Sequence, residues 1–237
     1  MRATASTWWA PKSGHAPNEY EDAYAVAPAT LRFAVADGAS ETSFAKEWAE
    51  LLVARFVAEP PEPADLRAWI APMQATWAES HLARPAAWYA EQKAREGAFA
   101  SLLGVALADD RWRALAVGDS CLFVVRAGKL QRAFPFEKAE QFNNGPVLLS
   151  SVERANLNVW SGVQSEQGVL QARDQLLLMT DALAHWFLTE AELGRRPWAA
   201  LDRVETPAAF EDMMQFLRRG GALRNDDVTL VRLEVAA

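Results

Sequence analysis

Residues 21–38 of the chain, EDAYAVAPATLRFAVADG, contain two short apolar runs separated by turn residues. Ala23–Val26 and Leu31–Ala36 are rich in Ala, Val and Phe, and a proline lies between them. Short runs of this composition on either side of a turn predict two antiparallel strands joined by a tight connection. An aspartate lies just outside each strand, with Asp22 before the first and Asp37 after the second.

Helical periodicity follows this hairpin. Apolar residues recur at helical spacing from Phe44 to Phe56, which predicts an amphipathic helix that ends at a cluster of three prolines. The residues that could cap its N-terminus are Ser40, Thr42 and Ser43. A second helix is predicted from about Ala64 to Leu82, with Pro72 breaking or kinking it partway.

The rest of the chain groups strands and helices into separate runs. Strands are predicted at Ala98–Ala106, Trp112–Val117 and Leu122–Arg126, as an antiparallel meander, and at Gln175–Thr180 and Val228–Val235. Helices are predicted at Ala182–Leu193 and Pro207–Arg218, the latter with Thr206 as its cap. Residues 133–168 show weak periodicity and predict irregular connections with one or two short strands. This grouping favours an antiparallel α+β architecture over a Rossmann-like sheet.

Composition excludes several classes of function. The net charge is −7 and no stretch concentrates Lys and Arg, which argues against a nucleic-acid partner. Cys121 is the only cysteine, so the chain has no disulfide framework and no thiolate metal cluster. No apolar run approaches the roughly 18 residues of a membrane span. We expect residues 1–237 to form one cytoplasmic domain, a monomer that does not bind membranes.

Aspartates recur at the ends of the predicted strands. They are Asp22, Asp37, Asp119, Asp181 and Asp226, the last of which is followed by Asp227. One acid at a strand end is usually a turn or cap residue, but several carboxylates on one sheet edge repel one another unless a cation neutralises them. Oxygen ligands without His or Cys indicate Mg²⁺ or Mn²⁺. Two such ions roughly 3.5–4 Å apart stabilise an in-line displacement at phosphorus, which predicts a phosphoester hydrolase.

The order and spacing of these motifs resemble the metal-dependent protein phosphatase family, also called type 2C, and in particular its bacterial branch. The matching strings are Glu21-Asp22-Ala23-Tyr24, Val35-Ala36-Asp37-Gly38, Ala116-Val117-Gly118-Asp119-Ser120, Leu178-Met179-Thr180-Asp181 and Asn225-Asp226-Asp227-Val228-Thr229-Leu230-Val231. The resemblance covers nearly the whole chain. It implies a four-layer αββα sandwich, in which two central antiparallel sheets are flanked by helices.

The resemblance also implies a role for each acid. Asp22, Asp181 and Asp226 would bind one metal ion, and Asp22, Asp37 and the carbonyl of Gly38 would bind the other. Asp119, with Asp181, would hold a third, loosely bound ion. The implied cofactors are therefore two or three Mg²⁺ or Mn²⁺ ions, and the implied substrate is a phosphoprotein, such as a serine/threonine kinase or its target.

The chain departs from the family pattern at Pro17 and in the three residues after Asp37-Gly38. Pro17 lies five residues before Asp22, where the family usually has an arginine that binds the substrate phosphate. Lys12 and His15 are the nearby candidates to replace it, although an ammonium group does not reproduce a bidentate guanidinium. After Asp37-Gly38 the chain continues Ala39-Ser40-Glu41, without the family's further glycines.

Other reactive residue types have structural interpretations. Cys121 begins an apolar strand and lacks the Cys-x5-Arg loop of cysteine phosphatases, which predicts a buried thiol. His81 and His185 lie in helical stretches and are expected to be packing residues. Trp48, Trp69 and Trp77 fall on apolar helical stripes and are expected in the core, whereas Trp8, Trp9 and Trp88-Tyr89 are candidates for exposure.

Two functional hypotheses follow. The first is a Mg²⁺- or Mn²⁺-dependent serine/threonine protein phosphatase in which Asp22, Asp37, Asp181 and Asp226 carry the chemistry. The second is a catalytically silent phosphatase-like domain that binds phosphoproteins or other partners, which Pro17 and the altered Asp-Gly-Ala-Ser string favour. Retention of every acidic ligand argues against the second hypothesis, since a binding module has no need of repelling carboxylates.

Overall fold

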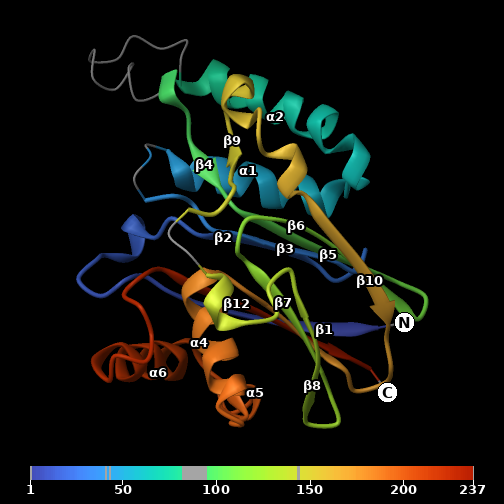
Figure 1. Cartoon of the computed structure of the whole chain (residues 1–237), viewed down its shortest axis with the longest axis vertical. Helices are drawn as coiled ribbons and strands as arrows, with labels where there is room; N and C mark the ends of the chain where they lie inside the picture. Colours follow the sequence, from blue (N-terminus) through green and yellow to red (C-terminus); the bar gives the residue numbers. More distant parts are fainter. Residues whose placement is uncertain (1, 41, 43, 82–94, 143–144, 237) are drawn as a thin grey trace.

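The computed structural model describes residues 2–40, 42, 44–81, 95–142 and 145–236. Within these residues, two five-stranded antiparallel sheets pack face to face (Figure 1). The first sheet has the order β1-β12-β11-β7-β8, with β1 at Ala3–Ala10, β12 at Val228–Val235, β11 at Gln175–Met179, β7 at Cys121–Arg126 and β8 at Lys129–Phe134. The second has the order β10-β6-β5-β3-β2, with β10 at Gln164–Val169, β6 at Arg111–Val117, β5 at Leu102–Ala108, β3 at Arg32–Ala36 and β2 at Ala23–Ala27.

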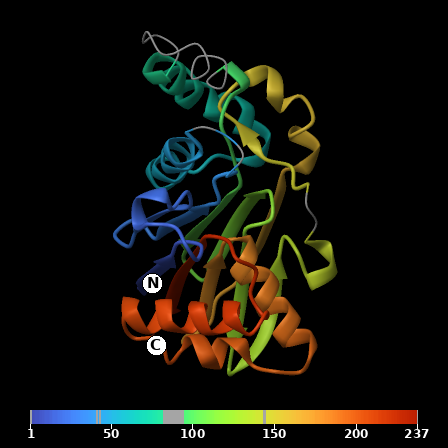
Figure 2. The same ribbon diagram turned by 90° about the vertical axis from the view of Figure 1, so that its left-hand side faces the viewer.

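Helices cover the outer face of each sheet (Figure 2). Helices α1 (Ala45–Ala58) and α2 (Leu66–His81) lie over the second sheet, and α4 (Asp181–Glu192), α5 (Pro197–Leu201) and α6 (Pro207–Arg219) lie over the first. A short pair of strands, β4 (Phe99–Ala100) and β9 (Leu149–Ser150), lies beside α1. Short 3₁₀ helices are η1 (Pro17–Glu19), η2 (Pro63–Asp65), η3 (Ala139–Gln141), η4 (Glu153–Asn156) and η5 (Trp160–Gly162). The predicted four-layer αββα sandwich is confirmed.

The alternation of side chains along β3 shows how the layers form. Phe33 and Val35 point between the two sheets, whereas Ala34 and Ala36 point toward the helices, because successive strand residues face opposite sides. The alanines leave room for α1 to pack closely, and Trp48 fills the space above them. Trp48, Trp69 and Trp77 are all buried, as predicted.

The predicted meander is wrong at one point. Strands β5 and β6 pair as expected, but β7 does not pair with β6; it lies in the other sheet, between β11 and β8. The chain changes sheet at Gly118, whose φ of +100° is accessible mainly to glycine. A Cβ at this position would also lie 2.6 Å from the Cβ of Ser101. This crossing carries Asp119 to the ends of both sheets.

Three smaller expectations also differ from the structure. Helix α1 has Phe44 at its N-cap, in the left-handed region, without a side-chain cap. The Ser40 hydroxyl accepts from Lys12 and the Thr42 hydroxyl donates to the carbonyl of Ala39, and Ser43 lies outside the described residues. Helix α2 continues through Pro72, so the proline does not break it. Strand β1 was not predicted; it forms an edge of the first sheet through its pairing with β12. The predicted Thr206 cap is confirmed, since its hydroxyl accepts from the N–H of Ala209.

Candidate functional site

Five aspartates gather where the ends of both sheets meet. We call Asp22, Asp37, Asp119, Asp181 and Asp226 the carboxylate cluster. In the second sheet, the pairing of Ala23 with Ala36 brings the start of β2 beside the end of β3. In the first sheet, Met179 pairs with both Cys121 and Leu230, so the end of β11 lies beside the starts of β7 and β12. Antiparallel register thus places the acids of each sheet at one of its ends, and the packing of the two sheets brings both groups together.

Asp22 is the most constrained member of the carboxylate cluster. Its side chain is buried, and its Oδ2 accepts hydrogen bonds from the hydroxyls of Thr180 at 2.9 Å and Thr229 at 2.6 Å. The Tyr20 hydroxyl lies 2.5 Å from the Thr229 hydroxyl, and the Thr180 hydroxyl accepts from the N–H of Thr229. Burial, with the charges of Asp227 and Asp181, raises the pKa of Asp22 well above its usual value despite these donors. The network fixes one carboxylate oxygen in a defined direction.

Asp37 is the cluster member on which the charges of all four others act. Its backbone is held by Ser101, whose hydroxyl accepts from the Asp37 N–H at 3.0 Å and whose own N–H donates to the Asp37 carbonyl at 2.9 Å. Burial raises the pKa of Asp37 well above its usual value, and the charges of the four other carboxylates raise it further. Four acids acting on one carboxyl group show that the cluster is close enough for strong repulsion.

Gly38 follows Asp37 in an isolated bridge to Ala100. The hydrogen bonds of this bridge use the Asp37 carbonyl and the Ala39 N–H, and the carbonyl of Gly38 takes no part in them. A Cβ on Gly38 would lie 2.6 Å from the carbonyl oxygen of Glu21, so only glycine fits. The Gly38 carbonyl is therefore available as an additional oxygen ligand.

Asp119 and Asp226 each feel the charge of one basic residue of the protein. Burial raises the pKa of Asp119 to about 7, and the charges of Asp181 and Asp226 also raise it, whereas Arg224 lowers it. Burial and the charge of Asp181 raise the pKa of Asp226, which Lys12 lowers. Arg224 is thus the basic neighbour of Asp119, and Lys12 is that of Asp226.

Asp181 is the first residue of α4 and is held by two donors. Its Oδ1 accepts from the N–H of Ala182 at 2.5 Å, and its Oδ2 accepts from Nη2 of Arg224 at 2.8 Å. The sequence did not indicate this arginine, since nothing in a local pattern links residues 43 positions apart.

Asp227 has a structural role that the sequence did not indicate. Its side chain is buried, and its two oxygens accept from the N–H groups of Lys12 at 2.8 Å and Glu21 at 2.7 Å. It therefore fastens both ends of the segment between β1 and β2 to the start of β12. Both of its oxygens hold backbone N–H groups, so the role of Asp227 is structural, although its charge also raises the pKa of Asp22.

The donor chemistry of the cluster suits Mg²⁺ or Mn²⁺. It consists of carboxylates and the backbone carbonyl of Gly38, which are the hard oxygen ligands that these ions prefer. Within the described residues, no three His, Cys, Asp or Glu side chains are already oriented as a ligand set. The reason lies in the bonds above: Asp22 is turned toward two threonines and Asp181 toward Arg224. The two threonines hold only Oδ2 of Asp22, whereas Arg224 holds Oδ2 of Asp181 with a charged group.

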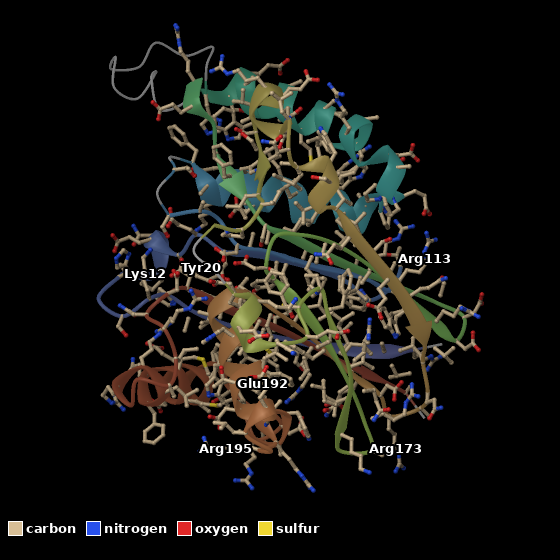
Figure 3. The ribbon with its side chains drawn as sticks, in the orientation of Figure 1. Lys12, Tyr20, Arg113, Arg173, Glu192 and Arg195 are labelled. Carbon is tan, nitrogen blue, oxygen red and sulfur yellow. The ribbon has the colours of Figure 1, made fainter. Side chains whose placement is uncertain are left out.

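Lys12 lies close enough to the cluster for its charge to act on Asp226, and His15 lines the same cavity as Lys12. Nζ of Lys12 donates to the hydroxyl of Ser40 at 2.8 Å and lies 3.7 Å from Oε2 of Glu21. Lys12 and Tyr20 lie at the same side of the molecule (Figure 3). His15 lies 3.9 Å from Glu19 at the surface. Of the two candidates to replace the family arginine, Lys12 is the one whose charge acts on a cluster acid, Asp226.

The remaining reactive side chains are packed. Cys121 is fully buried, and its thiol, whose pKa burial raises far above the usual value, donates to the carbonyl of Asp119. The ring of His81 stacks on Trp77, and its Nδ1 lies 2.9 Å from the Trp77 carbonyl. His185 packs edge-on against Phe142. Trp8 is buried, Trp9 is half-buried, and Trp88-Tyr89 lie outside the described residues.

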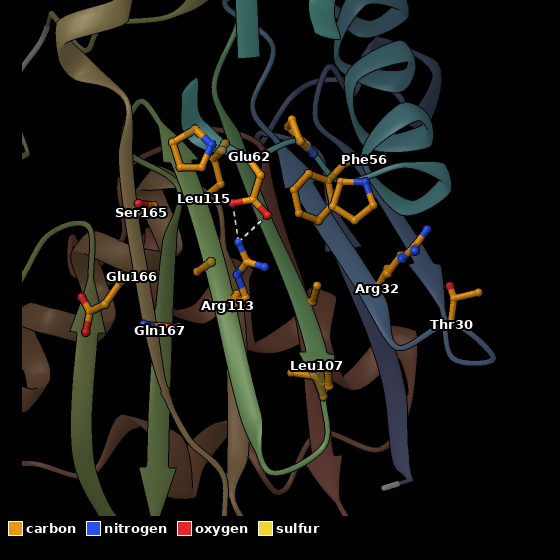
Figure 4. A pocket seen from close by; sticks show the side chains of 16 residues that line it. Thr30, Arg32, Phe56, Glu62, Leu107, Arg113, Leu115, Ser165, Glu166 and Gln167 are labelled. Carbon is orange, nitrogen blue, oxygen red and sulfur yellow. Dashed lines mark hydrogen bonds and ion pairs between the residues drawn. The ribbon is translucent and has the colours of Figure 1, made fainter. Parts of the chain in front are cut away.

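A cavity of about 680 Å³ lies at the opposite ends of the strands (Figure 4). Its two arginines are already engaged: Arg32 donates to the carbonyls of Val57 and Ala58, and Arg113 pairs with Glu62. None of the carboxylate cluster lines this cavity. It therefore plays no part in the candidate site.

Comparison with known proteins supports the fold and identifies the family. The sequence matches the family described as Protein phosphatase 2C over residues 16–226. The Mycobacterium tuberculosis serine/threonine phosphatase PstP/Ppp is 18% identical, with a TM-score of 0.68 and 100% of both chains covered. The catalytic domain of PstP with two manganese ions is 19% identical, with a TM-score of 0.66 and coverage of 100% of this chain and 99% of that one.

A third solved structure is PppA of Pseudomonas aeruginosa, described as a regulatory component of its type VI secretion system. It is 17% identical, with a TM-score of 0.59, and the match covers 98% of this chain and 97% of that one. No curated protein matches the sequence. Since the family match extends from η1 to the last aspartate of the carboxylate cluster, the chain belongs to the protein phosphatase 2C family.

Proposed function

We propose that this protein is a Mg²⁺- or Mn²⁺-dependent phosphatase that hydrolyses phosphoserine and phosphothreonine in proteins. The observation that carries the proposal is the carboxylate cluster, in which burial and mutual repulsion raise the pKa values of Asp22, Asp37, Asp119 and Asp226. Carboxylates that repel one another destabilise a fold unless a bound cation neutralises their charge. The oxygen ligands of the cluster are those that Mg²⁺ and Mn²⁺ prefer, which supports cation binding.

The residues divide the work of the proposed site. Asp22, Asp181 and Asp226 would hold one cation, Asp22, Asp37 and the Gly38 carbonyl a second, and Asp119 with Asp181 a third. When bound, the cations would lower the pKa of a water molecule and neutralise charge on the phosphoryl oxygens. Thr180 and Thr229 would orient the shared ligand Asp22 through its Oδ2.

The substrate and setting are part of the same proposal. The substrate is a phosphoprotein, such as a serine/threonine kinase or a protein that it phosphorylates, and the enzyme acts as a cytoplasmic monomer built from one domain over residues 1–237. A lone buried cysteine is in keeping with a reducing compartment. No helix in the described part of the chain is both long and apolar enough to span a membrane.

Release of phosphate from a phosphothreonine peptide, with Mn²⁺ and with EDTA, tests the proposal. Asp37→Asn and Asp226→Asn should each lower Mn²⁺-dependent turnover by at least about 100-fold, since each removes a charged ligand. Asp212→Asn, an exposed residue of α6, removes the same charge and should leave turnover unchanged. Circular dichroism of each variant verifies folding. Wild-type turnover that survives EDTA or Asp37→Asn would reject a metal-dependent mechanism.

A second function is favoured by one feature, the surface position of Pro17 at the start of η1. With no arginine there, the protein could bind phosphoproteins without hydrolysing them. In that case wild-type protein would bind Mn²⁺ and a phosphothreonine peptide in calorimetry and release no phosphate.

A further inference from the structure

Arg224 reaches from the surface onto a buried acid of the carboxylate cluster. It lies between α6 and β12, and 42% of its side chain is exposed, against 12% for that of Asp181. Its Nη2 lies 2.8 Å from Oδ2 of Asp181. A hydrogen bond between an ionised donor and an ionised acceptor is roughly twice as strong as a neutral one, and partial burial reduces its screening by water.

This bond places a positive charge on one of the two oxygens that Asp181 would offer a cation. The other oxygen of Asp181, Oδ1, accepts from the N–H of Ala182, so each oxygen of this carboxylate has a donor. The charge of Arg224 also reaches Asp119, whose pKa it lowers. The guanidinium therefore lies over the Asp181–Asp119 side of the cluster.

No other basic side chain in the described ranges hydrogen-bonds a carboxylate of the cluster. Lys12 is bound to Ser40 and lies beside Asp226. Arg218 donates to the backbone carbonyls of Pro11 and Asp226. Arg224 is thus placed to act on the side chain of Asp181 itself.

We propose that Arg224 is an internal counter-ion for Asp181 that a divalent cation must displace. This proposal rests on the proposed function, because it takes Asp181 to be a cation ligand. Arg224 and the cation exclude one another at Oδ2, because a guanidinium and a metal ion on the same oxygen repel. Arg224 therefore weakens cation binding on the Asp181–Asp119 side and stabilises the protein when no cation is bound.

Calorimetric titration of Mn²⁺ into the full chain tests this competition. Arg224→Gln should lower the Kd of the weakest Mn²⁺ site by about tenfold, the scale of one charged hydrogen bond. Arg224→Lys, which keeps the charge but not the planar fork, should give an intermediate Kd. Arg219→Gln is the matched control, since Arg219 is exposed on the last turn of α6 and its loss changes only net charge.

Thermal unfolding supplies an independent measurement. In EDTA, Arg224→Gln should lower the Tm relative to wild type and to Arg219→Gln, because it leaves Asp181 without its counter-ion. In saturating Mn²⁺ the difference should disappear, because the cation then replaces the arginine. Circular dichroism establishes that each variant is folded before either comparison.

Several results would overturn the proposal. Equal Kd values for wild type and Arg224→Gln would show that Arg224 does not compete, and an equal effect of Arg219→Gln would reduce its role to long-range charge. Absence of Mn²⁺ binding in every variant would remove Asp181 as a ligand. Failure of the proposed function is distinguishable: if wild type binds Mn²⁺ but releases no phosphate, phosphatase activity is rejected while the Kd comparison still decides the role of Arg224.

Discussion

Two threonine hydroxyls on neighbouring strands converge on one oxygen of Asp22. Thr180 follows β11 and Thr229 lies in β12, and they are linked by the bond from the Thr229 N–H to the Thr180 hydroxyl. Both positions were part of sequence motifs, but neither was assigned a contact. The carboxylate is 158 residues from Thr180 and 207 from Thr229, so only the folded chain brings them together.

Thr180→Val tests this network. The change keeps the shape of the side chain but removes a donor to Asp22 and the acceptor for the Thr229 N–H, and leaving buried groups unpaired costs about 1–3 kcal/mol. We expect urea unfolding to show a decrease of that size in the free energy of unfolding. Thr76→Val on the exposed face of α2 is the control, for which a change within about 0.5 kcal/mol is expected. Equal effects of the two changes would contradict a special role for the network.

At the scale of elements, α1 lies close to the second sheet at Gly104 of β5, because glycine has no side chain. A Cβ on Gly104 of β5 would lie 2.1 Å from Cε2 of Phe56. The ring therefore rests directly on the strand backbone, and the last turn of α1 is set by this contact. The helical pattern from Phe44 to Phe56 predicted which face of α1 is buried, but not the strand against which it packs.

Gly104→Ala should destabilise the protein by about 1–3 kcal/mol, since a buried ring must move to make room. The measurement is chemical unfolding of Gly104→Ala, Phe56→Leu and the double variant. Removing the ring should relieve the clash, so the double variant should be more stable than the sum of the two single effects predicts. Strict additivity would show that the glycine acts through backbone conformation instead.

At the scale of the whole molecule, the acids come from both sheets, and each sheet alone holds only part of the cluster. Asp22 and Asp37 flank the hairpin of the second sheet, and Asp181 and Asp226 lie at strand ends of the first. Asp119 is on the segment that joins the sheets. Assembly of the cluster therefore requires the complete sandwich, and its repulsion opposes that assembly when no cation is present.

This repulsion predicts the pH dependence of stability. The folded protein raises the pKa of Asp119 to about 7 from its usual value of 3.8, and raises those of Asp22, Asp37 and Asp226 as well. Between these values the folded state binds more protons than the unfolded state, so the free energy of unfolding should fall as pH rises from about 4 to 7.

Urea unfolding in EDTA across this pH range measures the dependence. Asp119→Asn should flatten the decline, and Asp212→Asn, on the surface of α6, should leave it unchanged. Mn²⁺ at pH 7 should restore stability, because it binds the folded state and neutralises the ionised acids. Stability that rises with pH in EDTA would contradict this account.

The sequence by itself determined the α+β class, most strands and helices, and the five aspartates at strand ends, because burial, periodicity and turn chemistry are local properties of the chain. The tertiary structure alone decided that β7 leaves β6 for the other sheet, that the polar edge strand β10 and the unpredicted β1 complete the sheets, and that Arg224 binds Asp181. Each of these features is a contact between residues far apart in the chain. The local sequence does not specify which distant residues will come into contact once the sheets have packed.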